Sequence, residues 1–281
     1  MIPKRSEIDH ETYHGIPVHV SRAAGRPLIF LIRMIAWETG IWDAVWSHLR
    51  GRFSVVNFNF FDTEAARQMA TPAEGFARFA RHCVDIAQWL GYEQFHLLGW
   101  VGGTQVAMRC AIDFPDRVQS CTLLNPHFEL PDMRSVQMGN RFKQAILEKD
   151  QELYSYYWVM SGLSNEFLES NFDVVKKLVD ARLAADRFVL GGTERFMQWA
   201  RALRTKCVSD EELGRIRVPT LVVAGGLERW SAGPGPTMAK LLHARIPGAA
   251  FALIEDAGEL VLVEAPEKFL KVLDRFLEGL A

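Results

Sequence analysis

The chain has 281 residues, 49% hydrophobic and 23% charged, which is enough to bury the core of one large globular domain with an inserted lobe. Its 32 basic and 34 acidic residues give a net charge of −2 and form no long run of either sign, which argues against a nucleic-acid partner. The first residues lack the apolar core of a signal peptide and no apolar run could span a bilayer, so we expect a soluble, cytoplasmic protein without a membrane partner.

The first 126 residues alternate between apolar runs and amphipathic helical segments. Continuous apolar runs of four to eight residues are typical of parallel strands that are covered on both faces. Thr71 and Pro72 indicate the start of a helix, because threonine caps helix N-termini and proline is favoured at the first helical position. In chain order, the predicted elements are an edge strand or hairpin at 13–21, a strand at 27–32, a helix at 42–51, a strand at 53–61, a helix at 71–90, a strand at 95–100, a helix at 102–114 and a strand at 117–126.

Residues 127–214 interrupt this alternation, because their pattern is helical and rich in aromatic residues, with few strand signals. The alternation then resumes with a strand at 218–226, a helix at 235–245, a strand at 249–256 and a helix at 266–280. The pattern predicts an α/β fold with a mostly parallel, twisted sheet and helices on both faces. We therefore expect a core of residues 1–126 and 215–281, with residues 127–214 inserted as a helical cap.

Three motifs follow predicted strands: GWVGG at 99–103, VVAGGLE at 222–228 and EDAGELVLVEAPEKF at 255–269. They resemble the α/β-hydrolase family, in which G-x-S-x-G carries the nucleophile, an acid follows a later strand and a histidine follows the last one. The resemblance covers nearly the whole chain and points to the cap-bearing branch of epoxide hydrolases, C–C hydrolases and haloperoxidases. It implies the α/β-hydrolase fold for this chain.

The resemblance fails at the residues that carry the family's chemistry. Val101 stands where the family has serine, Glu259 where it has histidine, and Glu228 in the place of the acid. The family's His-Gly after the third strand is replaced by Arg33 and Met34, and FFDTE follows the next strand where a glycine-histidine turn is usual. Acyl transfer needs a hydroxyl or thiol and a base, so we expect no serine hydrolysis.

A second expectation concerns the backbone conformation of Val101. An elbow residue is normally held at positive φ, where a β-branched side chain is an outlier that costs about 1–3 kcal/mol. We predict that Gly99, Gly102 and Gly103 still enforce this conformation, and that a negative φ would show a relaxed turn.

Glu228 and Glu259 would face one small site if the fold places them as it places the acid and the histidine. Two carboxylates so close cannot both ionise cheaply, so they form a candidate proton-transfer pair. The favoured structural alternative is an ion-pair network in which Arg33 or Arg229 neutralises them. His127, just past the strand that ends in LLNP, is a candidate displaced base, although a surface or capping role is more common for such a histidine.

Aromatic residues on several loops predict a broad apolar pocket under the cap. The candidate ligand-binding residues are Arg33, Met34, Trp37, Trp100, Gly102, Trp230 and Tyr157. The backbone N–H groups of Gly102 and of Met34 or Ile35 could still hold an oxygen, because such a hole is built from main chain. The alternative is that the aromatic residues pack against the lobe without contacting a ligand.

Metal and cofactor chemistry has no motif in this sequence. The four cysteines, Cys83, Cys110, Cys121 and Cys207, stand far apart without a C-x-x-C pair, and no H-E-x-x-H is present. We expect the cysteines to be buried as small hydrophobic residues, and we expect neither a metal nor a cofactor.

Three functions fit these expectations. The leading one is a non-hydrolytic enzyme, such as a lyase, isomerase, cyclase or decarboxylase, acting on a mostly apolar small molecule. The alternative is an inactive pseudo-hydrolase that serves as a small-molecule binding, regulatory or scaffold protein. A hydrolase that uses carboxylate-activated water is a more distant option. The oligomeric state stays open, with a homodimer as one common outcome for a protein of this size.

Overall fold

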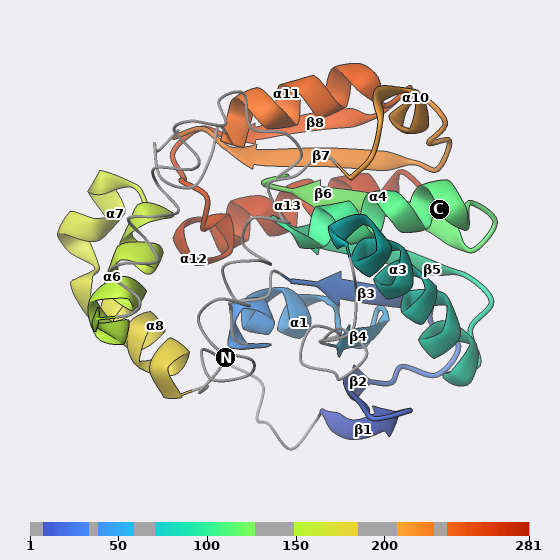
Figure 1. Cartoon of the computed structure of the whole chain (residues 1–281), viewed down its shortest axis with the longest axis horizontal. Helices are drawn as coiled ribbons and strands as arrows, with labels where there is room; N and C mark the ends of the chain where they lie inside the picture. Colours follow the sequence, from blue (N-terminus) through green and yellow to red (C-terminus); the bar gives the residue numbers. More distant parts are fainter. Residues whose placement is uncertain are drawn as a thin grey trace.

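A computed structural model describes residues 8–33, 39–58, 71–126, 149–184, 207–227 and 235–280 of the chain. Within these ranges, eight strands form a single sheet in the order β1-β2-β4-β3-β5-β6-β7-β8 (Figure 1). The strands are β1 (Asp9–Tyr13), β2 (Ile16–Ser21), β3 (Leu28–Ile32), β4 (Ser54–Phe58), β5 (Phe95–Trp100), β6 (Val118–Leu124), β7 (Thr220–Gly225) and β8 (Ala250–Ile254).

The sheet is mostly parallel, as the alternating pattern predicts. Only β1 and β2 pair antiparallel with each other, and β2 pairs antiparallel with β4, while all the pairings from β4 to β8 are parallel. Every residue of β3, β4, β5 and β7 is buried, which explains why these strands are continuous apolar runs in the sequence.

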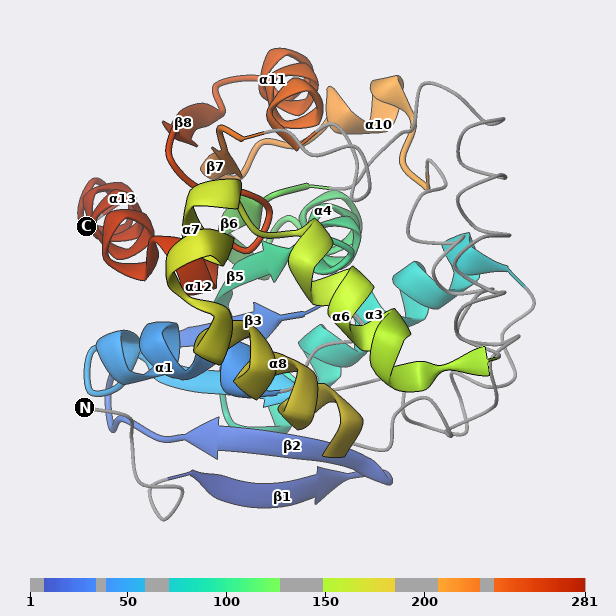
Figure 2. The same ribbon diagram turned by 90° about the vertical axis from the view of Figure 1, so that its left-hand side faces the viewer.

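Helices cover both faces of this sheet. Figure 2 shows α1 and α13 on one side of the central strands and α3 and α4 on the other, and each pair packs together. The helices outside the cap region are the 3-10 turn η2 (Thr39–Trp42), α1 (Asp43–Leu49), α3 (Pro72–Trp89), α4 (Gly103–Asp113), α10 (Asp210–Leu213), α11 (Gly235–Arg245), α12 (Val261–Glu264) and α13 (Pro266–Glu278). In α13 the buried residues Phe269, Leu273 and Leu277 are four apart, which places them on one helical face.

Helix α3 begins as its sequence predicts. Thr71 is the N-cap in extended conformation, its side chain accepts a hydrogen bond from the backbone N–H of Glu74 at 3.2 Å, and Pro72 occupies the first helical position.

The described part of the predicted cap, residues 149–184, is helical. It forms α6 (Gln151–Ser161), α7 (Asn165–Ser170) and α8 (Phe172–Ala184), which lie together beyond the C-terminal ends of the parallel strands (Figures 1 and 2). The junction of α6 and α7 is tied to the loop before α12, because Gly162 O accepts from Leu260 N at 2.9 Å. The division of the chain into core and cap at residues 127 and 214 stays a prediction.

The structure differs from the predicted elements in several ways. The edge strand or hairpin predicted at 13–21 is a hairpin that begins earlier, with β1 at Asp9–Tyr13 and β2 at Ile16–Ser21. The short helix α12 was not predicted, because one turn of four residues is too short to show a helical period. Several strands are one to three residues shorter than predicted, as for β6, where Asn125 and Pro126 follow the strand.

Two other properties complete the description. Among the described residues, no helix is long and apolar enough to cross a membrane.

The cysteines are buried, as expected for structural residues: Cys83, Cys110 and Cys121 fully and Cys207 in part. Burial raises the pKa of Cys110, Cys121 and Cys207, which keeps these thiols protonated.

Candidate functional site

The turn between β5 and α4 has the conformation of a nucleophile elbow. Val101 has a φ of +51°, which confirms the prediction made from its flanking glycines. Its N–H donates to Leu124 O at 2.9 Å, and its own carbonyl accepts from Thr104 N at 3.1 Å and from the Thr104 hydroxyl. A β-branched residue at positive φ is strained by about 1–3 kcal/mol, so surrounding contacts hold the turn in place.

Close backbone contacts at Gly99 and Gly103 hold the turn at Val101 in this conformation. A Cβ at Gly103 would lie well inside contact distance of Ile32 O, and a Cβ at Gly99 would lie 2.5 Å from Gly103 O. The backbone of α4 therefore starts directly against the ends of β3 and β5, and only glycine allows this approach. Gly102 is the N-cap of α4 and provides no side-chain cap.

The side chains at the elbow belong to the core. Val101 and Trp100 are both 0% exposed, and the Trp100 ring packs edge-to-face on Trp42 with 6.4 Å between ring centroids. Trp100 is the last residue of β5, which pairs in register with β6, as the predicted strand at 95–100 requires. The expectation that Trp100 lies on a loop at the rim of a pocket is wrong, because its side chain is buried against Trp42 at the end of the strand. Its role in ligand binding stays a prediction.

The ends of β7 and β8 bring the other two motifs together. Gly226 N donates to Ile254 O at 2.8 Å, and Leu227 N donates to Ala257 O at 3.0 Å. A Cβ at Gly225 would collide with Gly258 O, so the glycines of VVAGG serve this close approach. Leu227 directly precedes Glu228, which itself lies outside the described residues.

The loop that carries Glu259 reaches the elbow. Trp100 Nε1 donates to the backbone carbonyl of Glu259 at 3.4 Å, and Glu259 is half-buried. The carboxylate of Glu264 fixes this loop, accepting from Gly258 N at 2.9 Å and from Ser164 N at 3.1 Å. One acidic side chain thus joins the Glu259 loop to the start of α7, and sequence reasoning did not single it out.

The other predicted site residues divide into two groups. Arg33 is 4% exposed directly after β3, at the same edge of the sheet as the elbow, and Tyr157 is half-buried in α6. The candidates Glu228, Met34, Trp37, His127 and Trp230, together with Arg229, lie outside the described residues.

Asn125 is a residue at this edge that sequence reasoning missed. It follows β6, has a φ of +45° and is 1% exposed. Trp100 pairs with Leu124 across the sheet, so Asn125 stands beside Val101, and its N–H donates to Val223 O at 2.8 Å. An asparagine followed by proline at the end of an apolar strand was the available signal.

This arrangement limits the chemistry of the edge. The elbow positions an inert aliphatic side chain. Helix α4 begins without a side-chain cap, and although Thr104 N and Gln105 N donate to Val101 O and Gly102 O at 3.1 and 3.2 Å, the helix dipole favours a negatively polarised oxygen at this end. Among the described residues, no group of three or more histidines, cysteines and acids is placed to hold a metal ion. Of the two acidic candidates of the sequence analysis, Glu259 is the one within the described residues, and its backbone carbonyl lies at this edge.

The known proteins that this chain is similar to are described as having the α/β-hydrolase fold or are named as hydrolases. A family model described as "alpha/beta hydrolase fold" matches residues 41–174. "Putative carbamate hydrolase RutD" of Caulobacter sp. (strain K31) is 23% identical over 283 residues, covering 95% of this chain and 96% of that protein. The protein of the same name from Pseudomonas savastanoi pv. phaseolicola (strain 1448A / Race 6) is 22% identical over 269 residues, covering 93% and 98%.

Solved structures show the same fold. An α/β-hydrolase enzyme from a Medee basin deep-sea metagenome library, MGS-M2, superposes with a TM-score of 0.78 at 16% identity, over 96% of this chain and 97% of that one. The enol-lactonase from Burkholderia xenovorans LB400 gives a TM-score of 0.74 at 17% identity, over 96% of this chain and all of the other. At these identities the likeness concerns the arrangement of the chain and not its chemistry.

Proposed function

We propose that this chain, which has the α/β-hydrolase fold, does not carry out serine-dependent hydrolysis and instead acts by proton transfer on a small, mostly apolar organic molecule at the elbow. The observation that carries the proposal is Val101: it keeps the left-handed backbone of a nucleophile residue, yet its side chain is aliphatic and fully buried. A side chain without a lone pair or an acidic proton cannot attack a carbonyl.

The groups that remain at this edge favour chemistry without a protein nucleophile. The uncapped start of α4 favours an oxygen that gains negative charge, as in an enolate, and Glu259 lies on the loop that Trp100 contacts. A carboxylate near such an oxygen can move a proton to or from the adjacent carbon. This is the chemistry of lyases, isomerases, cyclases and decarboxylases, with Glu228 as the second carboxylate of the proposed pair.

A binding protein without turnover is the second candidate. It is favoured by the complete burial of Val101 and Trp100, since a packed elbow leaves those two side chains no contact with solvent. In this case the same edge would hold a ligand, and the signal would pass to a partner or to the cap.

The names of the relatives favour a third candidate, hydrolysis of a carbamate. Without a serine, a carboxylate such as Glu259 would have to activate water as the nucleophile. Such a hydrolase would release alcohol, carbon dioxide and ammonia from a carbamate ester and one water but would form no covalent acyl-enzyme.

Three measurements on the full chain separate these candidates. Native mass spectrometry of gently purified protein identifies a co-purified small molecule. Turnover of that molecule, and of a simple carbamate, is then compared for the wild type, Glu259→Gln and the control Glu255→Gln, whose exposed side chain lies four residues earlier. Catalysis predicts a loss of at least tenfold in Glu259→Gln alone, whereas a binding protein keeps its affinity in all three.

A fluorophosphonate probe tests the core of the proposal. We expect no covalent labelling of the wild type, because residue 101 offers no hydroxyl. Stoichiometric labelling that is blocked by a substrate would show a serine nucleophile elsewhere in the chain, and the proposal would be abandoned.

A further inference from the structure

The side chain of Asn125 is buried and makes no hydrogen bond to any residue that the structure describes. Asn125 is 1% exposed, and within the part of the chain that the structure describes neither Oδ1 nor Nδ2 has a hydrogen-bond partner. A carboxamide offers one acceptor and two donor hydrogens, and burying it unpaired costs about 1–3 kcal/mol in proteins. Such a group in a folded chain calls for an explanation.

Asn57 shows what a buried structural asparagine does in the same sheet. It is also 1% exposed, and within the described residues its Oδ1 has no partner either, but its Nδ2 donates to Leu31 O at 2.6 Å. The bond continues the ladder between β3 and β4 beyond its last backbone pair, which joins Phe30 and Val56. The Asn57 side chain therefore holds two strands together, whereas the Asn125 side chain holds nothing that the structure describes.

Backbone conformation alone does not account for Asn125. Its φ of +45° lies in the left-handed region, which asparagine tolerates better than most residues. Glycine adopts this region at no steric cost and brings no amide that must leave water. An asparagine at this position is therefore a poorer structural choice than glycine, unless its amide has a partner.

The position of Asn125 indicates what that partner is. The strand register places it beside Val101, and the backbone at Leu124 is bonded to Val101 N at 2.9 Å. In a parallel sheet, neighbouring strands lie about 5 Å apart, so one small ligand can contact residues on both strands. Asn125 thus stands next to the start of α4, at the edge where the proposed function places its substrate.

We propose that Asn125 is a ligand-binding residue that selects a planar group with both a carbonyl and an N–H, as in an amide or a carbamate. Such a group can accept from Nδ2 and donate to Oδ1 at the same time, which satisfies both atoms in one plane. An ester of the same shape offers only acceptors and leaves Oδ1 unpaired. This inference rests on the proposed function, since it assigns the substrate class of that same edge.

Isothermal titration calorimetry with two matched probes tests the assignment. Benzyl carbamate carries the N–H group, and benzyl acetate has the same size without it. We expect the wild type to bind benzyl carbamate about tenfold more tightly or better, because one buried polar atom is left unpaired in the acetate complex. We expect Asn125→Gly, which keeps the backbone conformation, to lose this preference.

Two further variants keep the test decisive. Asn125→Leu has nearly the same shape and offers neither a donor nor an acceptor, so it should also lose the preference if Asn125→Gly does not fold. His14→Gly is the matched control, because His14 is exposed in the β1–β2 turn and has a similar φ of +46°. It should keep the wild-type preference.

Thermal melting without ligand provides a readout that separates the two roles. A ligand-binding Asn125 predicts a melting temperature for Asn125→Gly that is unchanged or higher, because an unpaired amide is removed. A structural Asn125 predicts a lower melting temperature and an unchanged probe preference. Either a preference that survives in Asn125→Gly or a wild type without preference overturns the inference and leaves the proposed function standing. If neither probe binds the wild type, both are overturned.

Discussion

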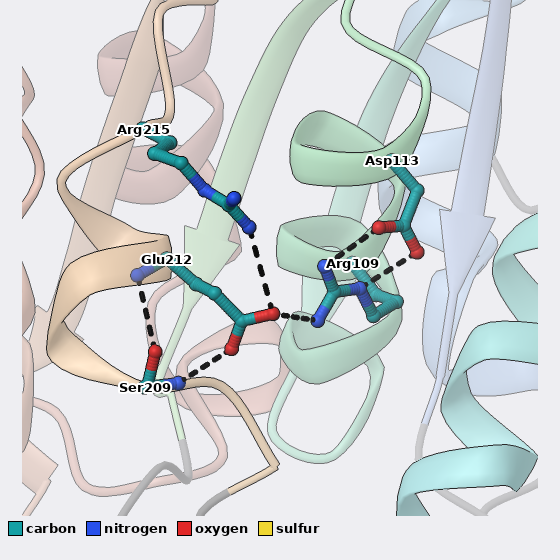
Figure 3. Close-up of polar contacts among 5 residues, drawn as sticks. All are labelled: Arg109, Asp113, Ser209, Glu212 and Arg215. Carbon is teal, nitrogen blue, oxygen red and sulfur yellow. Dashed lines mark hydrogen bonds and ion pairs between the residues drawn. The ribbon is translucent and has the colours of Figure 1, made fainter.

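The two ends of helix α4 are stabilised in opposite ways. At its start, Gly99 and Gly103 let backbone approach backbone, and no charged side chain takes part in the close contact at Ile32 O. Toward its end, Arg109 lies in a network of charged groups, which Figure 3 shows. The start of α4 is held by close backbone packing, and its end is held by ion pairs.

The charged end joins segments that are far apart in the sequence. Arg109 has a side chain only 12% exposed, and it donates to Asp113 through Nε at 2.7 Å and through Nη2 at 2.6 Å. Its Nη1 donates to Glu212 of α10 at 2.8 Å (Figure 3). Glu212 also accepts from Ser209 N at 2.8 Å and completes a capping box with this residue. The segment that leads into β7 is thereby fixed to the helix that follows the elbow.

This comparison indicates where the chain tolerates change. An inflexible backbone contact has no way to relax, whereas a partly exposed ion pair can be replaced by water at moderate cost. The elbow therefore has a rigid backbone shape, although the Val101 side chain that it positions is chemically inert.

The largest effect is expected for Gly103→Ala. The new Cβ would collide with Ile32 O, which belongs to a central strand and cannot move aside. We expect the free energy of unfolding to fall by about 3 kcal/mol or more, measured by urea denaturation.

The matched control is Gly40→Ala, where the added Cβ would meet only Asp43 Oδ2 at an ordinary 3.6 Å. This control should stay within about 0.5 kcal/mol of the wild type. Equal stability of the two variants would mean that α4 can shift away from β3.

A smaller effect is expected for Arg109→Ala. It leaves Asp113 without its cation, leaves Glu212 with only Arg215 at 3.8 Å, and removes the contact between α10 and α4, so we expect a loss of about 2 kcal/mol, discounted because both carboxylates are partly exposed. Lys176→Ala removes an exposed pair with Asp180 and should change stability by less than about 0.5 kcal/mol. Similar losses in both variants would show that the network adds nothing beyond surface pairing.

Acid should weaken the charged end of α4. Hydrogen bonds from the Ser209 backbone and from Arg109 lower the pKa of Glu212 from 4.5 to about 2. Because the folded-state pKa is lowered, the carboxylate stabilises the fold above pH 4.5, and this contribution is lost as the pH falls toward 2. We expect Glu212→Gln to cost about 1 kcal/mol at pH 7 and nothing near pH 2.

Urea denaturation across this pH range measures that difference. Glu211→Gln serves as the control, because the Glu211 side chain is exposed on the same short helix. A difference between wild type and Glu212→Gln that does not shrink in acid would contradict the assignment.

The smallest effect is expected for Val101→Gly. The variant loses a fully buried apolar side chain, at a cost of about 2 kcal/mol, and removes backbone strain of about 1–3 kcal/mol. The two terms oppose each other, so stability should change by less than about 1 kcal/mol.

Val106→Gly is the comparison variant, since Val106 is equally buried but lies within α4 in ordinary helical conformation. It should lose about 3 kcal/mol, because it gains no relief and places glycine in a helix. Equal losses in the two variants would mean that the elbow at Val101 is not strained.

Much of the fold followed from local patterns. The continuous apolar run of β3, the cap formed by Thr71 and Pro72, and the alternation of strands and helices were sufficient to predict a mostly parallel sheet with helices on both faces, and the resemblance of three motifs implied the α/β-hydrolase fold. The positive φ of Val101 was also predictable, because its flanking glycines are a local signal.

The site was less predictable, because its contacts join residues from distant segments. No pattern indicated that the Trp100 indole would bond to Glu259 O or that Glu264 would accept from Ser164 N, since 159 and 100 residues separate these partners. Asn125 appeared in the sequence only as a residue before proline, and its unpaired amide became visible once its burial was known.

The sequence by itself determined that residue 101 cannot act as a nucleophile, because a valine side chain has neither a lone pair nor an acidic proton in any conformation. It also determined most of the secondary structure, since periodicity and capping act within a few residues. The tertiary structure alone decided which polar groups are buried and paired, because hydrogen bonding and desolvation depend on neighbours that folding brings from far along the chain.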